Sequence, residues 1–167
     1  PKDCEAMYNL GLILKQEGKV EAAMDTLYRA VWNYNYNSAG NFQLAQLYVA
    51  QGDIPMALER LDEAIARNAD NFSALNLKAT ILRTRGDKAG ASACVKRVSE
   101  TDPVNAYAAY EQLLLGESDY FETLMRDEPE SYLELALAYL HNGFPETAVE
   151  LLERIDARTV SYTHLTL

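Results

Sequence analysis

The chain of 167 residues has few of the side chains that carry catalysis or cross-links, with only two cysteines and two histidines. Cys4 and Cys94 are too few and too far apart for a disulfide framework or a metal site, and they favour a reducing, cytoplasmic location. The sequence also contains no glycine-rich phosphate loop. These absences predict a protein that is not an enzyme and that needs neither cofactor nor metal.

Positive charge is scarce as well. Lysine and arginine number 15 against 25 aspartates and glutamates, which gives an acidic chain with a formal net charge of −10. This balance repels phosphate backbones and argues against nucleic-acid binding. No apolar run approaches the roughly 20 residues of a membrane span, and the first residues lack the basic-then-apolar pattern of a signal segment. A hydrophobic content of 49% is typical of a globular domain.

What the chain does contain is a repeat marked by glycine. Gly18, Gly52 and Gly86 are separated by 34 residues each. Gly143 has similar neighbours, although it follows Gly86 by 57 residues. A glycine suits the left-handed residue that ends a helix. Asp53 follows one of these glycines and is a good N-cap for a second helix. Each glycine is therefore predicted to lie in the turn of a helix pair.

The residues around the glycines have helical spacing. Those at i, i+3, i+4 and i+7 before each glycine form one stripe of a helix, and a second stripe follows it. Both stripes contain small residues, which allow two helices to approach closely. Because one pair cannot bury its apolar face alone, neighbouring pairs are expected to stack. The first stripes are Met7, Leu10, Gly11, Leu14; Asn41, Leu44, Ala45, Tyr48; Leu75, Lys78, Ala79, Leu82; and Tyr132, Leu135, Ala136, Tyr139.

Leu10-Gly11, followed by Leu14, Ala23 and Leu27, resembles the tetratricopeptide repeat, and similar copies follow around the other glycines. The leading Trp of that repeat is missing, and only the third copy keeps the late Pro, at Pro103. The resemblance implies an all-α, right-handed α-solenoid of about five antiparallel helix pairs. It also implies a non-catalytic protein–protein interaction module or scaffold.

The predicted repeat domain covers residues 1–158. Its helix pairs are expected at about 4–34, 38–68, 72–102, 104–127 and 129–156, and the fourth pair is irregular. Residues 160–165 resemble a translated sequencing adapter, so residues 159–167 are predicted to be a non-native tail that makes few contacts with the repeats. The segment 116–134 has seven acids and one base. A solvated outer face explains it most simply, and contact with a basic partner is the alternative.

A narrower resemblance rests on three short stretches, which begin at Tyr8, Tyr28 and Leu75. They are similar to the C-terminal repeats of large bacterial proteins whose N-terminal β-rich domain is thought to be carbohydrate-related. This resemblance implies an alternative function, as the structural C-terminal region of a larger bacterial carbohydrate-active enzyme. The partner would then be the missing N-terminal domain of the same chain.

The predicted binding surface is the concave groove of the solenoid, which would hold a protein or peptide partner. In the tetratricopeptide family the first helix of each pair lines this groove. An aromatic row that ends in an amide and a cation suits an extended peptide, and packing of the same rings against neighbours is the alternative. We expect the row formed by Tyr8, Phe42 and Asn76 to be solvent-accessible. The predicted groove residues are Tyr8, Leu12, Lys15, Phe42, Gln46, Val49, Asn76, Thr80 and Arg83.

Two further features have mainly structural interpretations. His141 is expected at the end of a helix, where a cation favours the helix dipole. The aromatic cluster in residues 32–37 alternates like a strand, but the period places it at a helix end and turn. We expect it to pack at a repeat junction, with a sugar-stacking or partner-contact edge as the alternative.

Overall fold

The computed structural model describes residues 3–126 and 128–165, with side chains for residues 4–126 and 128–155. Its described residues form ten helices in antiparallel pairs, which confirms the predicted all-α fold. The fourth pair is short, as expected. The helices are α1 (Asp3–Gln16), α2 (Val20–Ala30), α3 (Tyr34–Gln51), α4 (Ile54–Arg67), α5 (Phe72–Thr84), α6 (Lys88–Thr101), α7 (Ala106–Leu115), α8 (Tyr120–Met125), α9 (Pro129–His141) and α10 (Pro145–Leu165).

The helix boundaries follow the predicted local signals. Gly52 ends α3 with φ of 77°, and the Asp53 carboxylate then accepts a hydrogen bond of 3.1 Å from the backbone N–H of Met56. One boundary differs from the prediction, because α3 begins at Tyr34 rather than at residue 38. The Asn33 side chain accepts a bond from the backbone N–H of Asn35, which caps this earlier start.

Small residues stand where the helices of a pair meet. The equivalent alanines Ala23, Ala57 and Ala91 are fully buried. At Gly11 a Cβ atom would lie 2.7 Å from Cγ of Leu27, so only glycine fits this crossing without a shift. The spacing of small residues in the sequence therefore reflects close helix packing.

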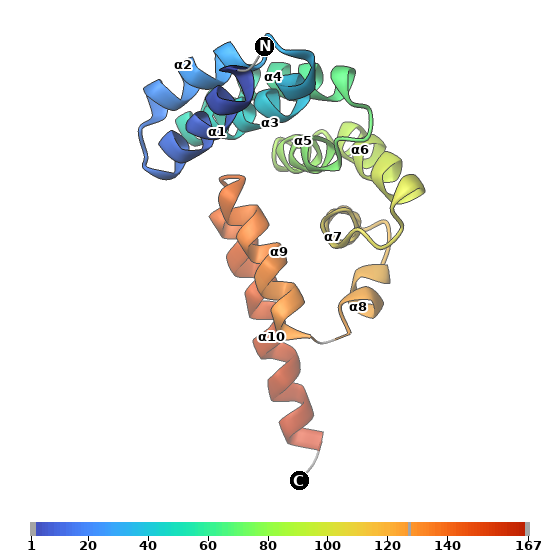
Figure 1. Cartoon of the computed structure of the whole chain (residues 1–167). Helices are drawn as coiled ribbons and strands as arrows, with labels where there is room; N and C mark the ends of the chain where they lie inside the picture. The colour runs from blue at the N-terminus through green and yellow to red at the C-terminus, as the bar shows by residue number, and fades with distance from the viewer. Residues whose placement is uncertain (1–2, 127, 166–167) are drawn as a thin grey trace.

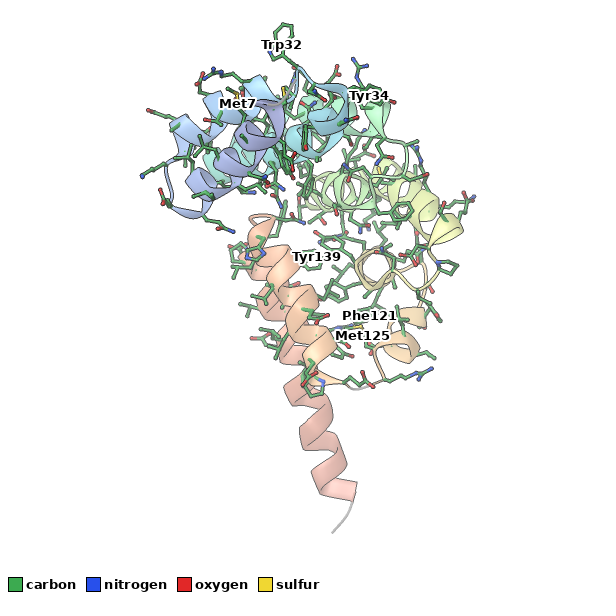
Figure 2. All side chains as sticks on the ribbon, viewed as in Figure 1. Met7, Trp32, Tyr34, Phe121, Met125 and Tyr139 are labelled. Atoms are coloured by element: carbon green, nitrogen blue, oxygen red, sulfur yellow. The ribbon has the colours of Figure 1, made fainter. Side chains whose placement is uncertain are left out.

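The second half of the chain is held together by aromatic side chains. Tyr110 on α7, Phe121 on α8 and Tyr132 on α9 are buried, and their ring centroids lie 4.8 and 5.7 Å apart in succession. Figure 2 shows Phe121, Met125 and Tyr139 between α9 and the short α7–α8 pair. This core joins the fourth and fifth pairs into one body.

The first three pairs form an arc, and the α9–α10 pair points its turn toward the concave side of that arc (Figure 1). Figure 1 also shows α10 continuing past α9. No side chain beyond Ile155 is described. The expectation that residues 159–167 make few contacts therefore lies outside the residues whose side chains are described.

Candidate functional site: the concave face

The concave face is built by the first helices of the first three pairs. Helices α1, α3 and α5 each contribute three of the predicted groove residues, at the same distances before the glycine or turn that ends the helix. This common register places the residues in rows across the arc. The turn between α9 and α10 approaches these rows from below in Figure 1.

The α9–α10 turn occupies part of this face. The Gln46 side-chain amide on α3 donates a hydrogen bond of 2.7 Å to Oδ1 of Asn142, which follows α9. A Cβ atom on Gly143 would lie only 2.9 Å from Cγ1 of Val49, so the turn touches α3 closely. Phe144 packs against the apolar cluster of the second and third pairs, where Phe42 also lies. A segment of this chain thus binds the groove surface of α3.

A buried carboxylate anchors the deeper part of the face. Glu111 on α7 is 0% exposed and accepts hydrogen bonds of 2.8 Å from the hydroxyls of Thr80 and Tyr139. The Arg83 guanidinium donates to the same carboxylate, with Nε at 2.6 Å from Oε2 and a second nitrogen at 3.2 Å from Oε1. Burying a charge is tolerated when it is paired and fully hydrogen-bonded, as it is here.

Tyr107 connects this carboxylate to the α9–α10 turn. Its hydroxyl lies 2.9 Å from the Thr80 hydroxyl and accepts a bond of 3.2 Å from the Asn142 side-chain amide. The rings of Tyr107 and Tyr139 stack with centroids 4.2 Å apart. Hydrogen bonds therefore run without a break from Gln46 through Asn142, Tyr107 and Thr80 to Glu111.

The network is also reflected in its pKa values. Burial raises the pKa of Tyr107 and that of Tyr139 well above the usual range for tyrosine, so both hydroxyls stay protonated. Burial alone would lower the pKa of Arg83, but the hydrogen bond and the charge of Glu111 outweigh it and raise that pKa. The Arg83 guanidinium is therefore charged at neutral pH, and its contact with Glu111 serves as structure.

An open pocket remains beside the occupied part of the face. It has a volume of about 360 Å³ and lies between α1, α3 and the end of α9. On its wall, Nζ of Lys15 donates to Oε1 of Gln43 at 2.7 Å and to Oε1 of Gln46. Among the described side chains, Lys15 forms no ion pair. The pocket is lined by Leu12, Lys15, Gln16, Gln43, Gln46 and His141.

Burial lowers the pKa of Lys15 to about 8. The ammonium group is then partly desolvated, and it has only neutral amide oxygens to bond. A carboxylate brought into the pocket would supply the missing negative charge and make a charge-assisted hydrogen bond. The chemistry available in this pocket suits an acidic group beside the apolar side chain of Leu12.

The predicted groove residues differ in accessibility. Tyr8, Leu12, Lys15, Phe42, Val49 and Arg83 are partly buried, and Gln46, Asn76 and Thr80 are buried. The expectation that Asn76 is solvent-accessible is therefore wrong, since its exposed fraction is 6%. Asn76 donates a bond of 3.1 Å to Asn105 at the start of α7, so the following pair covers it. Tyr8 packs against Tyr36, with ring centroids 5.5 Å apart.

The aromatic cluster after α2 corrects a second expectation. Trp32 is 90% exposed and Tyr34 is 77% exposed, so neither packs at the repeat junction. Figure 2 shows Trp32 projecting from the top of the molecule, on the side of the arc that faces away from α9. Only Tyr36 follows the prediction, through its contact with Tyr8. The junction is instead closed by the side-chain amide of Asn37, which donates to the backbone oxygen of Val31.

Sequence reasoning missed Glu111, Tyr107 and Asn142. A signal for Glu111 was present, because it is the only charged residue of α7 and directly follows Tyr110 on a largely apolar helix. No local signal marks Asn142, whose role depends on a partner far along the chain. His141 lies at the end of α9 as expected, and it also lines the open pocket.

The described residues hold no cluster of histidine, cysteine or carboxylate side chains that could bind a metal ion. Within the same residues, no helix has the length and hydropathy needed to cross a membrane.

Similar proteins were found through sequence families and solved structures. Models described as tetratricopeptide repeat match residues 5–34, 42–94 and 129–154, which together are more than half of the chain. No curated protein matches the sequence significantly.

Two solved structures illustrate the shared fold. MamA from Desulfovibrio magneticus RS-1, residues 41 to the end, is 17% identical with a TM-score of 0.66, over 96% of this chain and 97% of that one. A tetratricopeptide repeat protein from Parabacteroides merdae is 19% identical with a TM-score of 0.66, over 94% of this chain and 66% of that one. At these identities the likeness extends to the fold alone.

Proposed function

Because the chain belongs to the tetratricopeptide repeat family, we propose that it is a non-catalytic protein-interaction module that binds a peptide or a neighbouring domain through its concave face. The site is the open pocket between α1, α3 and the end of α9. The bound segment would place an acidic side chain or a terminal carboxylate against Lys15 and an apolar side chain against Leu12.

One observation carries this proposal: the concave face already binds polypeptide. The α9–α10 turn is held on α3 by the Gln46–Asn142 hydrogen bond and by the packing of Phe144. The open pocket continues the same surface toward α1, because Gln46 and His141 border it. A surface that holds one turn through an amide and an apolar contact has the chemistry to hold a second segment beside it.

The surroundings of Lys15 favour a ligand with an acidic group. Its ammonium group is partly buried and bonds only neutral amides among the described side chains, so a ligand carboxylate would recover electrostatic energy lost on folding. In a chain with a net charge of −10, a cation at the mouth of a pocket also provides a local attraction for an acidic group.

The test is a selection of binding peptides from a random displayed library, with the 167-residue chain as bait. Selected peptides are then measured by titration calorimetry against the wild type and matched variants. Lys15→Gln and Leu12→Ala alter the pocket. Lys96→Gln on the exposed face of α6 and Leu10→Ala on the exposed face of α1 repeat the same changes elsewhere.

We expect the selected peptides to share an acidic residue near an apolar one. Each pocket variant should weaken binding by at least about 1 kcal/mol, as is usual for an interface anchor, and each control should leave it unchanged. If no peptide is enriched, or if the pocket and control variants bind equally well, the proposal is wrong.

A further inference from the structure

Among the described residues, the last helix pair exposes a row of leucines that no other helix covers. Leu133, Leu137 and Leu140 on α9 have exposed fractions of 51%, 52% and 52%, and Val149 on α10 has 54%. Residues at this spacing lie on one stripe of a helix, about 10 Å long. In Figure 1, α7 and α8 lie on one side of the α9–α10 pair, and no helix of the described residues lies on the other.

These leucines occupy the groove register of the fifth pair. Counted back from Gly143, they stand where Tyr8, Leu12 and Lys15 stand relative to Gly18. Val149 follows Gly143 at the same distance as Met24 follows Gly18.

In the earlier pairs, residues at these positions contact the next helix pair. Lys15 bonds to Gln43 and Gln46 on α3, and Thr80 and Arg83 bond to Glu111 on α7. On the second helices, Met24 packs against the cluster containing Leu44 and Leu47 of α3. The equivalent positions of α9 and α10 are thus built to receive a following helix, and their side chains here are aliphatic.

The surroundings of the leucine row are acidic. Helix α9 contains no lysine or arginine, and Glu130 and Glu134 are exposed on it. Among the residues of α10 whose side chains are described, 145–155, the only base is Arg154, which is turned toward Glu122, at 3.6 Å, and the ring of Tyr110. The exposed acids of this helix are Glu146, Glu150 and Glu153. Carboxylates therefore border an apolar stripe on both helices.

We propose that the α9–α10 surface formed by Leu133, Leu137, Leu140 and Val149 docks a basic amphipathic helix of a partner protein. The apolar face of that helix would cover the leucine row, and its lysines or arginines would meet the bordering carboxylates. A second copy of this acidic chain fits less well, because like charges would meet around the row. The surface is separate from the Lys15 pocket, so either proposal can fail alone.

The test uses fluorescence anisotropy with the 167-residue chain and a labelled, designed helix of about 14 residues, or roughly four turns. The probe carries leucines at i, i+4 and i+7 and lysines at the flanking positions. A twin probe has glutamates in place of the lysines. Leu137→Gln combined with Leu140→Gln alters the row, and Leu10→Gln combined with Ile13→Gln makes a matched change at exposed positions of α1.

We expect the lysine probe to bind and the glutamate twin not to bind. The α9 double variant should bind at least about tenfold more weakly, whereas the α1 double variant should bind like the wild type. Glu134→Gln combined with Glu150→Gln should weaken binding and reduce its salt dependence. Melting temperatures of all variants verify that they fold.

Three results would overturn the proposal. The lysine probe could fail to bind, the two double variants could lose affinity equally, or the glutamate twin could bind as well as the lysine probe. Sedimentation adds one more: a wild-type dimer that the α9 double variant abolishes would identify a second copy of this chain as the occupant and would exclude a basic partner.

Discussion

Gln46 and Asn142 are joined by a side-chain hydrogen bond of 2.7 Å although 96 residues separate them in the sequence. Gln46 lies in the middle of α3, and Asn142 lies at the tip of the last helix pair. Both side chains are buried. The bond therefore joins the last helix pair to the concave side of the arc and partly closes the concave face from within.

The first prediction concerns this link. In a double-mutant cycle, Gln46→Ala and Asn142→Ala should each lower the free energy of unfolding, and the coupling between them should be roughly 1 kcal/mol. The measurement is urea unfolding followed by circular dichroism. Gln43→Ala, paired with Asn142→Ala, provides the control cycle, because Gln43 bonds Lys15 and not Asn142. A coupling near zero for the main cycle would contradict the closed arrangement.

A second prediction concerns the crossing of α3 and α4. Ala57 is fully buried in the cluster that also contains Ala45. Replacing it with leucine overpacks the crossing and should lower stability by roughly 1–3 kcal/mol. Ala66→Leu makes the same change on the exposed face of α4 and should have little effect. Equal melting temperatures for the two variants would show that Ala57 does not lie at the close crossing of α3 and α4.

The third prediction concerns Arg83 and Glu111. Glu111→Gln leaves the Arg83 guanidinium without its counter-ion, and Arg83→Met leaves a buried carboxylate without its cation. Each change should cost roughly 3 kcal/mol, because breaking a buried pair leaves one charge uncompensated. The double variant should lose clearly less than the sum of the two. Additive losses in urea unfolding would mean that the pair contributes no coupling.

The helix pairs could be predicted from sequence because their signals are local and repeated. Gly52 and Asp53 define a turn through their own conformation and capping, and Gly11 marks a close crossing through its size. Such features need no knowledge of distant residues. Because the sequence repeats, the same turn, cap and close crossing recur in the next helix pair.

Which residues of the groove and the repeat junction are covered and which are exposed could not be predicted in the same way. Asn76 has the register of an exposed groove residue, but α7 begins over it and Asn105 bonds its amide. The covering of α3 depends on Asn142 and Phe144, which lie about 100 residues further along the chain. Trp32 shows the opposite error, since an aromatic residue at a junction was expected to pack and is exposed. Contacts between different helix pairs decide the first two cases.

The last prediction concerns the pH dependence of stability. In the folded protein the pKa of Lys15 is lowered from 10.5 to about 8 by burial. Between these values the unfolded chain binds more protons than the folded protein, so the contribution of Lys15 to stability rises with pH. Below about pH 8 the amine is charged in both states, and its desolvation penalty is then fully present.

Replacing Lys15 with methionine removes this titration. The stability gained by Lys15→Met relative to the wild type should therefore be largest below pH 8 and should shrink steadily up to pH 10. Unfolding in urea at a series of pH values measures the difference, in which the tyrosines common to both proteins cancel. Lys96→Met, at an exposed position of α6, is measured over the same pH series as the control. If the difference in free energy of unfolding between Lys15→Met and the wild type does not change with pH, water reaches the Lys15 ammonium group. The pocket would then lack the partly desolvated cation on which its preference for acidic ligands depends.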